Sequence, residues 1–132
     1  MMRASRVRPA GNFEATAWFF MRVSGVILIL IALFHMLWMH FVVSVETITF
    51  ATIVERWTGP QGAFWRIFDL MLLVFAFTHG INGMRQVIDD YVESRGWNAF
   101  LQTSIWIVWA VLLGMGAWII FTFQPNMPTP FK

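Results

Sequence analysis

The strongest constraint on this chain is a set of three long apolar segments, at about 15–43, 63–90 and 98–123. A helix rises about 1.5 Å per residue, so about 20 mainly apolar residues cross the roughly 30 Å hydrocarbon layer of a bilayer. Inside lipid every backbone amide must find its partner within its own helix, which excludes open strands. The sequence therefore predicts an all-α membrane protein with three transmembrane helices. The connection between the first two segments is expected to be a loop that ends in TGPQG.

Composition agrees with a membrane protein and narrows the chemistry. The 132 residues are 58% hydrophobic and only 12% charged, which leaves too little polar surface for a soluble domain of this length. The chain has no cysteine, which excludes disulfides, thiolate metal sites and a cysteine nucleophile. Its net charge of +2 forms no basic patch suited to nucleic acid. Because the sequence has no internal repeat, residues 1–132 are interpreted as a single transmembrane domain.

The distribution of basic residues predicts the orientation. Five lie at one end of the predicted bundle and three at the other: Arg3, Arg6, Arg8, Arg85 and Arg95 against Arg56, Arg66 and Lys132. Cytoplasmic loops carry an excess of such residues, so the N-terminus is expected to be cytoplasmic. The basic start of the chain is followed by no secretory cleavage site and is too short for a mitochondrial transit peptide. We therefore expect a multi-pass protein of the bacterial inner (plasma) membrane.

Ionisable residues inside the predicted spans carry the functional signal, because such residues usually face a partner, a cavity or a cofactor. His35 and His79 are two of them. Taken alone, each imidazole can bind a metal or haem, bond a neighbouring helix or relay a proton. Gly80 and Gly83 lie close to His79 and leave space for a flat macrocycle, but small residues equally permit plain helix packing.

Depth separates the two histidines. If the first helix enters from the cytoplasm and the second returns, His79 lies roughly 24 Å from the outer end of its helix and His35 roughly 12 Å from its own. Imidazoles at such different depths in the membrane cannot be the two axial ligands of one iron. If they are ligands, they imply two cofactors and a partner chain that supplies further histidines. His40 lies nearer the outer surface and is interpreted as an interfacial side chain, with replacement of His35 as the alternative.

Two further ionisable residues have competing interpretations. Arg22 lies just inside the first span, where it can snorkel to the near surface or face anionic carboxylates such as haem propionates. Asp69 stands three residues after Arg66. This helical spacing favours an ion pair between them over a proton-carrying role for the carboxylate.

The inner end of the second span combines an acid with a phenol. Asp90 shares a helix face with His79, and Tyr91 lies about 18 Å beyond that histidine, near the cytoplasmic headgroups. A phenol can donate a hydrogen bond to a quinone carbonyl, and an adjacent carboxylate can relay a proton. Spacing alone favours an ordinary solvated helix end.

Two stretches resemble a known family. HGINGMRQVIDDYV, over 79–92, is similar to the H-x3-G-x6-DY signature of the smaller membrane-anchor subunit of succinate dehydrogenase (respiratory complex II). FMRVSGVILILIALFH, over 20–35, resembles the first helix of that family, whereas the third span matches only as hydrophobic sequence. The similarity covers all three spans, so residues 1–132 would form one anchor domain.

The resemblance implies a role for each candidate residue. His79 would be an axial, iron-binding ligand of haem b, with the opposite ligand supplied by the larger cytochrome b anchor subunit. Arg22 would approach the haem propionates, and Tyr91 beside Asp90 would border a ubiquinone or menaquinone site near the iron–sulfur subunit. His35 matches the first-helix histidine of anchors with two haems, where it binds the iron of the haem farther from the cytoplasm.

One residue departs from the family pattern, and the role of another is undecided. Arg85 stands where some relatives have a large aromatic residue, so the edge of the quinone pocket is expected to differ. Ser24 can face the same pocket, and no pattern in the first span decides this.

The implied activity is electron transport linked to the tricarboxylic acid cycle. A flavoprotein subunit would oxidise succinate, the iron–sulfur subunit would pass electrons to the membrane, and quinone would accept them. This chain then performs no succinate chemistry and supplies no catalytic residue. A fumarate reductase anchor is the alternative on the same scaffold. A haem-free structural membrane adaptor and a small proton-conducting channel are alternatives of other classes, and a lone acid expected to pair with Arg66 makes a poor relay.

Overall fold

The computed structural model of the chain describes residues 12–124, a range that consists of helices and short connections and contains no strand. Three helices, α1 (Asn12–Leu37), α3 (Gly62–Tyr91) and α4 (Arg95–Thr122), are long and apolar enough to cross a bilayer. α1 continues as a π-helix over Trp38–Val42. The predicted all-α membrane fold with three spanning helices is therefore confirmed.

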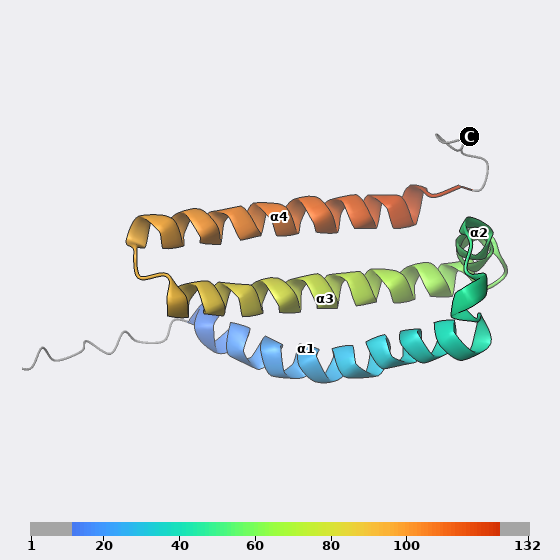
Figure 1. The fold of residues 1–132 in the computed structure, drawn as a ribbon, viewed down its shortest axis with the longest axis horizontal. Helices are drawn as coiled ribbons and strands as arrows, with labels where there is room; N and C mark the ends of the chain where they lie inside the picture. Colours follow the sequence, from blue (N-terminus) through green and yellow to red (C-terminus); the bar gives the residue numbers. More distant parts are fainter. Residues whose placement is uncertain (1–11, 125–132) are drawn as a thin grey trace, which may run out of the picture.

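The three long helices run side by side, with α3 between α1 and α4 (Figure 1). α4 approaches α3 closely at Gly116, where a Cβ atom would lie 2.7 Å from Cδ2 of Leu73 and would force that side chain to shift. The start of α1 and the α3–α4 connection mark one end of the bundle, which we call the inner end, and α2 marks the outer end. Four of the basic residues that predicted the orientation lie outside the described range: Arg3, Arg6, Arg8 and Lys132.

The connection between the first two spans is not the plain loop expected from its sequence. A 3-10 turn over Val45–Thr47 is followed by α2 (Phe50–Thr58), which Figure 1 shows nearly end-on across the outer end of the bundle. A capping box starts α2, in which the amide of Thr49 donates to Oγ1 of Thr52 at 3.1 Å. A helix of nine residues is marginal alone, and α2 is stabilised by packing against α3. Its local sequence signal is correspondingly weak.

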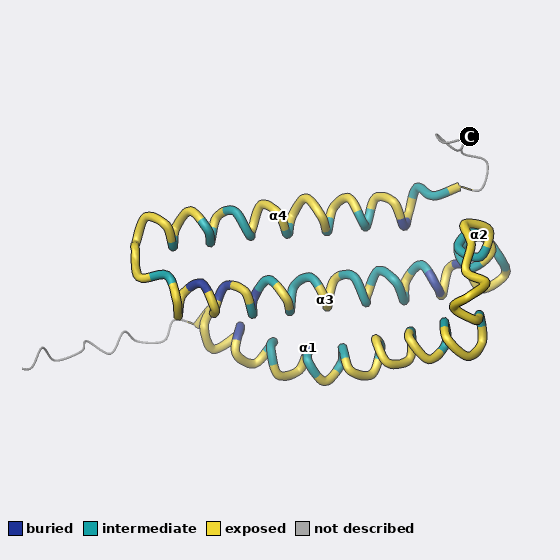
Figure 2. The backbone as a smooth tube through the Cα atoms, viewed as in Figure 1, coloured by how far each residue is buried: buried dark blue, intermediate teal, exposed yellow. Residues whose placement is uncertain are grey.

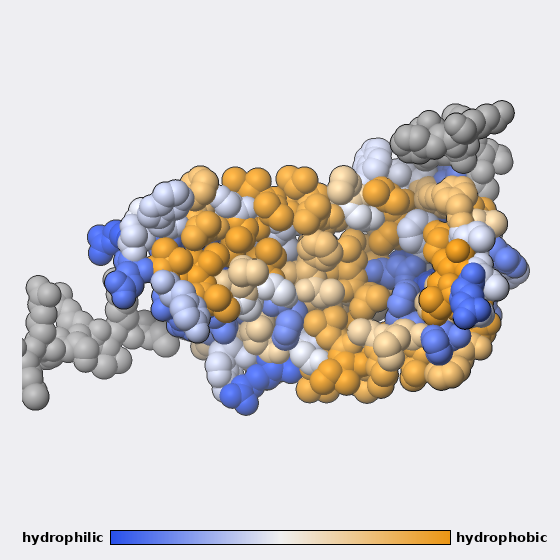
Figure 3. Space-filling model, in the orientation of Figure 1, coloured by the Kyte–Doolittle hydropathy of each residue, from blue (hydrophilic) through white to orange (hydrophobic). Residues whose placement is uncertain are grey.

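The bundle has only a thin interior. Its buried apolar and polar side chains are Ala17, Trp65, Ile88 and Ile120, and Ser24, Asn82 and Arg85. Figure 2 shows the buried positions concentrated along α3, while most of α1 and α4 is exposed. Figure 3 shows a largely apolar band between polar ends. Such a band suits lipid or neighbouring membrane subunits, because the bilayer interior is itself apolar.

Candidate functional site

His79, in the middle part of α3, is held by Ser24 of α1. Ser24 Oγ lies 2.8 Å from Nδ1 of His79 and 3.4 Å from the carbonyl oxygen of Met21. With the hydroxyl proton donated to Met21, Oγ accepts a hydrogen bond from Nδ1–H. The other ring nitrogen, Nε2, then keeps its lone pair and can bind a metal. The structure thus joins a candidate ligand to a serine that the sequence left undecided.

Small residues surround this imidazole. A Cβ atom at Gly25 would lie 3.5 Å from Cε1 of His79, so α1 passes directly beside the ring. Gly83 also faces α1, where a Cβ atom would lie 3.5 Å from Cε of Met21. A Cβ atom at Gly80, in contrast, would meet no atom within 4 Å, and this residue is exposed next to the half-buried histidine. The open flank at Gly80 can accept a flat macrocycle or a helix of another subunit.

Arg22, expected near haem propionates, is exposed on α1 and stacks on a neighbouring indole. Its Cζ atom lies 4.1 Å from the centre of the Trp18 ring. Within residues 12–124 no acidic side chain forms a salt bridge with it. A cation–π contact leaves the guanidinium donors free, so this charge can serve an anionic cofactor or lipid headgroups.

Tyr91 and Asp90 lie open at the inner end. Tyr91 is the last residue of α3 and is 82% exposed, and Asp90 is exposed beside it. The adjacent Asp89 is instead bound to α4, because Asn98 Nδ2 and Gln102 Nε2 donate to its Oδ1 at 3.0 and 2.9 Å. Of the two neighbouring acids, Asp90 is therefore the one whose carboxylate stays uncommitted among the described residues.

Arg85 turns inward instead of standing at an exposed edge. Its Nη1 and Nη2 atoms each lie 3.0 Å from a carboxylate oxygen of Glu14, and its Nε donates to Oδ1 of Asn82 at 3.3 Å. The side chain is buried between α3 and the start of α1. The sequence carried no signal for this partner, because Glu14 lies 71 residues before Arg85.

At the outer end, the predicted ion pair between Arg66 and Asp69 is wrong. Asp69 accepts hydrogen bonds from Arg56 Nη2 and, at 2.8 Å, from Trp57 Nε1, and both donors lie on α2. Arg66 donates instead to the carbonyl oxygens of Trp57 and Ile120, both at 2.9 Å. The last carbonyls of a helix lack partners within it and carry partial negative charge, so the end of α4 competes for this guanidinium. Helical spacing could not anticipate α2, which supplies the partner of Asp69.

His35 joins the same group of side chains. We use the name outer polar cluster for His35, Arg56, Trp57 and Asp69. Nδ1 of His35 lies 3.4 Å from Nη2 of Arg56 and 3.8 Å from Oδ1 of Asp69. His40 is exposed on the π-helix and lies outside this cluster. Of the two outer histidines, His35 is the one that the fold holds in place.

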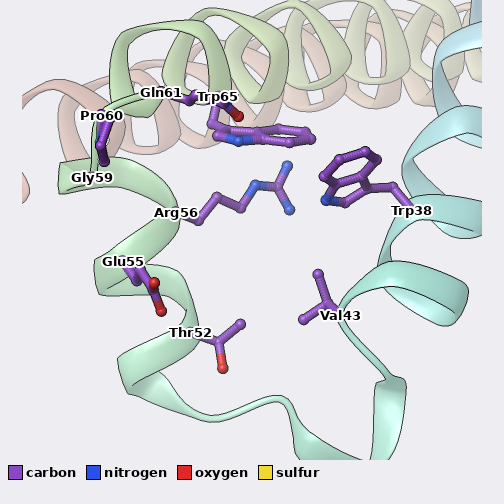
Figure 4. Close-up of a pocket in the computed structure, with 9 residues that line it drawn as sticks. All are labelled: Trp38, Val43, Thr52, Glu55, Arg56, Gly59, Pro60, Gln61 and Trp65. Atoms are coloured by element: carbon purple, nitrogen blue, oxygen red, sulfur yellow. The ribbon is translucent and has the colours of Figure 1, made fainter.

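Arg56, which the sequence marked only as a topology signal, lies at the centre of the outer polar cluster. Its Cζ atom is 4.3 Å from the centre of the Trp65 ring, and its Nη1 is 3.1 Å from Sδ of Met39. Burial lowers the pKa of Arg56, and the adjacent Asp69 opposes this shift. Figure 4 shows the guanidinium close to the indoles of Trp38 and Trp65, which with Arg56 line a cavity of about 380 Å³.

Within residues 12–124, no three side chains of His, Asp or Glu gather where they could hold a metal ion together. Haem needs no such cluster, because the porphyrin supplies four ligands and the protein supplies only the axial ones.

Three features of the bundle are typical of a membrane subunit that works inside a larger assembly. It has three spanning helices around a thin core, the His79 imidazole is bonded to a neighbouring helix, and Asp90 and Tyr91 are exposed at the inner end. The sequence agrees: residues 3–121 match the family described as the succinate dehydrogenase/fumarate reductase transmembrane subunit, and the chain belongs to this family. The resemblance seen in the first two spans is thus confirmed. No curated protein sequence matches the chain. The protein is a multi-pass membrane subunit of an oxidoreductase complex and associates with the other subunits of that complex.

Proposed function

We propose that this chain anchors a bacterial succinate:quinone oxidoreductase in the inner membrane, holds haem b together with a larger cytochrome b anchor subunit, and helps form the quinone site. The observation that carries this proposal is the 2.8 Å contact between Ser24 Oγ and His79 Nδ1. In the tautomer whose Nδ1–H donates to Oγ, Nε2 is the free ligand atom of the ring. The sequence distribution of basic residues, with five flanking one set of predicted span ends and three flanking the other, supports a cytoplasmic N-terminus.

The residues around His79 fit a haem. One imidazole from this chain suffices when a neighbouring subunit supplies the other axial ligand. Gly80 leaves space on the flank of the ring, and Arg22 has donors free for propionates. When bound, haem b supplies one-electron transfer. This chain would supply the axial nitrogen from His79 and the positive charge of Arg22 beside the propionates. Its apolar helix faces would exclude water from the haem.

At the inner end, Tyr91 and Asp90 would meet the quinone. The phenol donates a hydrogen bond to a quinone carbonyl, and the Asp90 carboxylate accepts or delivers the accompanying proton. Their exposure supports a site completed by the iron–sulfur subunit, which receives electrons from the flavoprotein subunit. Asp89 is kept out of this exchange by its bonds to α4.

His35 is proposed as an axial ligand of a second haem nearer the outer face. The support is that the outer polar cluster fixes His35 through two side-chain partners. Nδ1 of His35 lies 3.4 Å from Nη2 of Arg56, which can only donate, and 3.8 Å from Oδ1 of Asp69, too far for a hydrogen bond. His40 has no such partner among the described residues, which favours His35 over the alternative.

The test is the haem content of the purified complex with His79→Ala, and His40→Ala is the matched control. We expect His79→Ala to lose the cytoplasm-side haem while the flavoprotein and iron–sulfur subunits still copurify. His40→Ala should keep the wild-type content, because this exposed histidine lies outside the outer polar cluster. Full haem content in His79→Ala contradicts the assignment, and a haem-free wild-type complex makes the chain a structural adaptor. Rates of succinate oxidation and fumarate reduction with ubiquinone and menaquinone separate succinate dehydrogenase from fumarate reductase.

A further inference from the structure

Ser24 is the most deeply buried side chain in the described part of the chain. It is 0% exposed, although it is polar and lies on a helix that spans the membrane. A buried hydroxyl without a partner is costly, so its contacts explain its presence. The contact with Met21 is long at 3.4 Å, whereas the contact with Nδ1 of His79 has the length of a good hydrogen bond at 2.8 Å. The imidazole is therefore the main partner of this hydroxyl.

The backbone beside Ser24 also fits the ring. Gly25 follows it, and a Cβ atom there would already be in van der Waals contact with Cε1 of His79, at 3.5 Å. A larger side chain at this position would press on the imidazole. Ser24 and Gly25 thus form a seat on α1 that restrains the ring by one hydrogen bond and one close contact.

We propose that Ser24 is a positioning residue for the haem ligand. By accepting a hydrogen bond from Nδ1–H of His79, its hydroxyl fixes the tautomer and the ring orientation, so that Nε2 is presented to iron. This inference rests on the proposed haem site. The two can be tested separately, because the haem assignment requires only the His79 imidazole, whereas this inference concerns the hydrogen bond from that imidazole to Ser24.

The hydrogen bond has a measurable electronic consequence. An acceptor on Nδ1–H makes the imidazole a stronger donor, which stabilises ferric iron more than ferrous iron. Loss of the acceptor should therefore shift the haem midpoint potential to more positive values. Loss of such a partner typically weakens metal binding by about tenfold or more, so haem should also be lost faster.

The experiment uses the whole purified complex with Ser24→Ala, Ser24→Val and Ser24→Thr. Threonine keeps the hydroxyl, and valine has nearly the shape of threonine without it, so this pair separates bonding from packing. The readouts are the midpoint potential, the electron paramagnetic resonance spectrum of the ferric haem and the rate of haem loss to excess apomyoglobin. We expect wild-type values for Ser24→Thr. For Ser24→Ala and Ser24→Val we expect a more positive potential, an altered spectrum and haem loss about tenfold faster.

Wild-type potential, spectrum and haem retention in both Ser24→Ala and Ser24→Val would overturn the role of Ser24 and leave the haem site intact. If Ser24→Ala fails to assemble, the Ser24→Thr and Ser24→Val pair decides, and equal potentials in the two variants overturn the proposal. A wild-type complex without haem, or a haem unaffected by His79→Ala, overturns the proposed function itself and this inference with it.

Discussion

Glu14 and Arg85 form a two-point ion pair that joins the start of α1 to α3. Each guanidinium Nη atom lies 3.0 Å from a carboxylate oxygen, and Arg85 is only 8% exposed. The pair lies at the inner end, on the helix that carries Asp90 and Tyr91. It therefore restrains how α1 sits against the helix with the proposed quinone groups.

Replacing Glu14 removes the two-point partner of the buried Arg85 and leaves only the longer ionic contact of its Nη1 with Oδ2 of Asp89, at 3.6 Å. We expect Glu14→Gln to lower the free energy of unfolding by about 1–2 kcal/mol, less than for a fully buried pair because the Glu14 side chain is 55% exposed. Thermal unfolding of the detergent-purified complex, followed by tryptophan fluorescence, measures this loss. Glu93→Gln is the control, because Glu93 is exposed and forms no salt bridge within residues 12–124. Equal Tm values for the two variants contradict the expectation.

Asp69 should couple to Arg56 and not to Arg66. In double-mutant cycles, Asp69→Asn with Arg56→Gln should show an interaction of about 1–3 kcal/mol, because the two side chains share a hydrogen bond. Asp69→Asn with Arg66→Gln should show a much smaller one, because Arg66 bonds carbonyls at the end of α4. Tm values of the four single and double variants measure both couplings. The reverse order of the couplings contradicts the described contacts.

Tyr91 should affect quinone reduction without affecting haem. Tyr91→Phe keeps the ring and removes the phenolic hydrogen bond, which contributes roughly 0.5–1.5 kcal/mol, so we expect succinate:quinone activity to fall by up to about tenfold. Haem content and succinate oxidation with a soluble dye should stay unchanged. Asp89→Asn is the companion variant. It should lower Tm and have little effect on quinone turnover, because the Asp89 carboxylate accepts hydrogen bonds from α4. Unchanged quinone turnover in Tyr91→Phe removes this residue from the proposed site.

The absence of cysteine allows a clean test of orientation. Glu55→Cys lies on α2 at the outer end, and Glu93→Cys lies in the α3–α4 connection at the inner end. With the inner end in the cytoplasm, a membrane-impermeant maleimide should label intact cells at the first position only. Both should react in broken membranes. Labelling of Glu93→Cys but not Glu55→Cys in intact cells reverses the proposed orientation.

His35 and His40 should differ in their effect on haem number. We expect His35→Ala to reduce the haem content of the complex by one haem and His40→Ala to leave it unchanged, because only His35 is held by the outer polar cluster. The pyridine haemochrome assay, referred to flavin, gives the count. Equal haem content in His35→Ala and wild type removes the second haem from this chain.

The sequence predicted those features that depend on neighbouring residues along the chain. The three spans follow from runs of apolar residues, and the family follows from a short signature that begins at His79. α2 was not predicted, because its nine residues gain their stability from packing on α3. α1 and α4 each begin three residues before the predicted spans, at Asn12 and Arg95, since a helical backbone satisfies its own amides in the headgroup region as well as in lipid.

Contacts between distant residues could not be predicted in the same way. Ser24 lies 55 residues before His79, and nothing in α1 showed which helix its hydroxyl faces. Asp69 has a suitable cation three residues away, yet its partner is supplied by the fold of α2 against α3. Local spacing identified the charged groups correctly and paired them wrongly, because carbonyls at the end of α4 compete for Arg66.

The central claim is that this chain holds haem b in the membrane through His79. Its most direct test is the reduced-minus-oxidised absorption spectrum of the purified wild-type complex, with haem counted against flavin. We predict a haem b α band with at least one haem per flavin, and loss of one haem in His79→Ala. A wild-type complex without Soret absorbance, or an iron whose two axial ligands both come from other subunits, would contradict the claim.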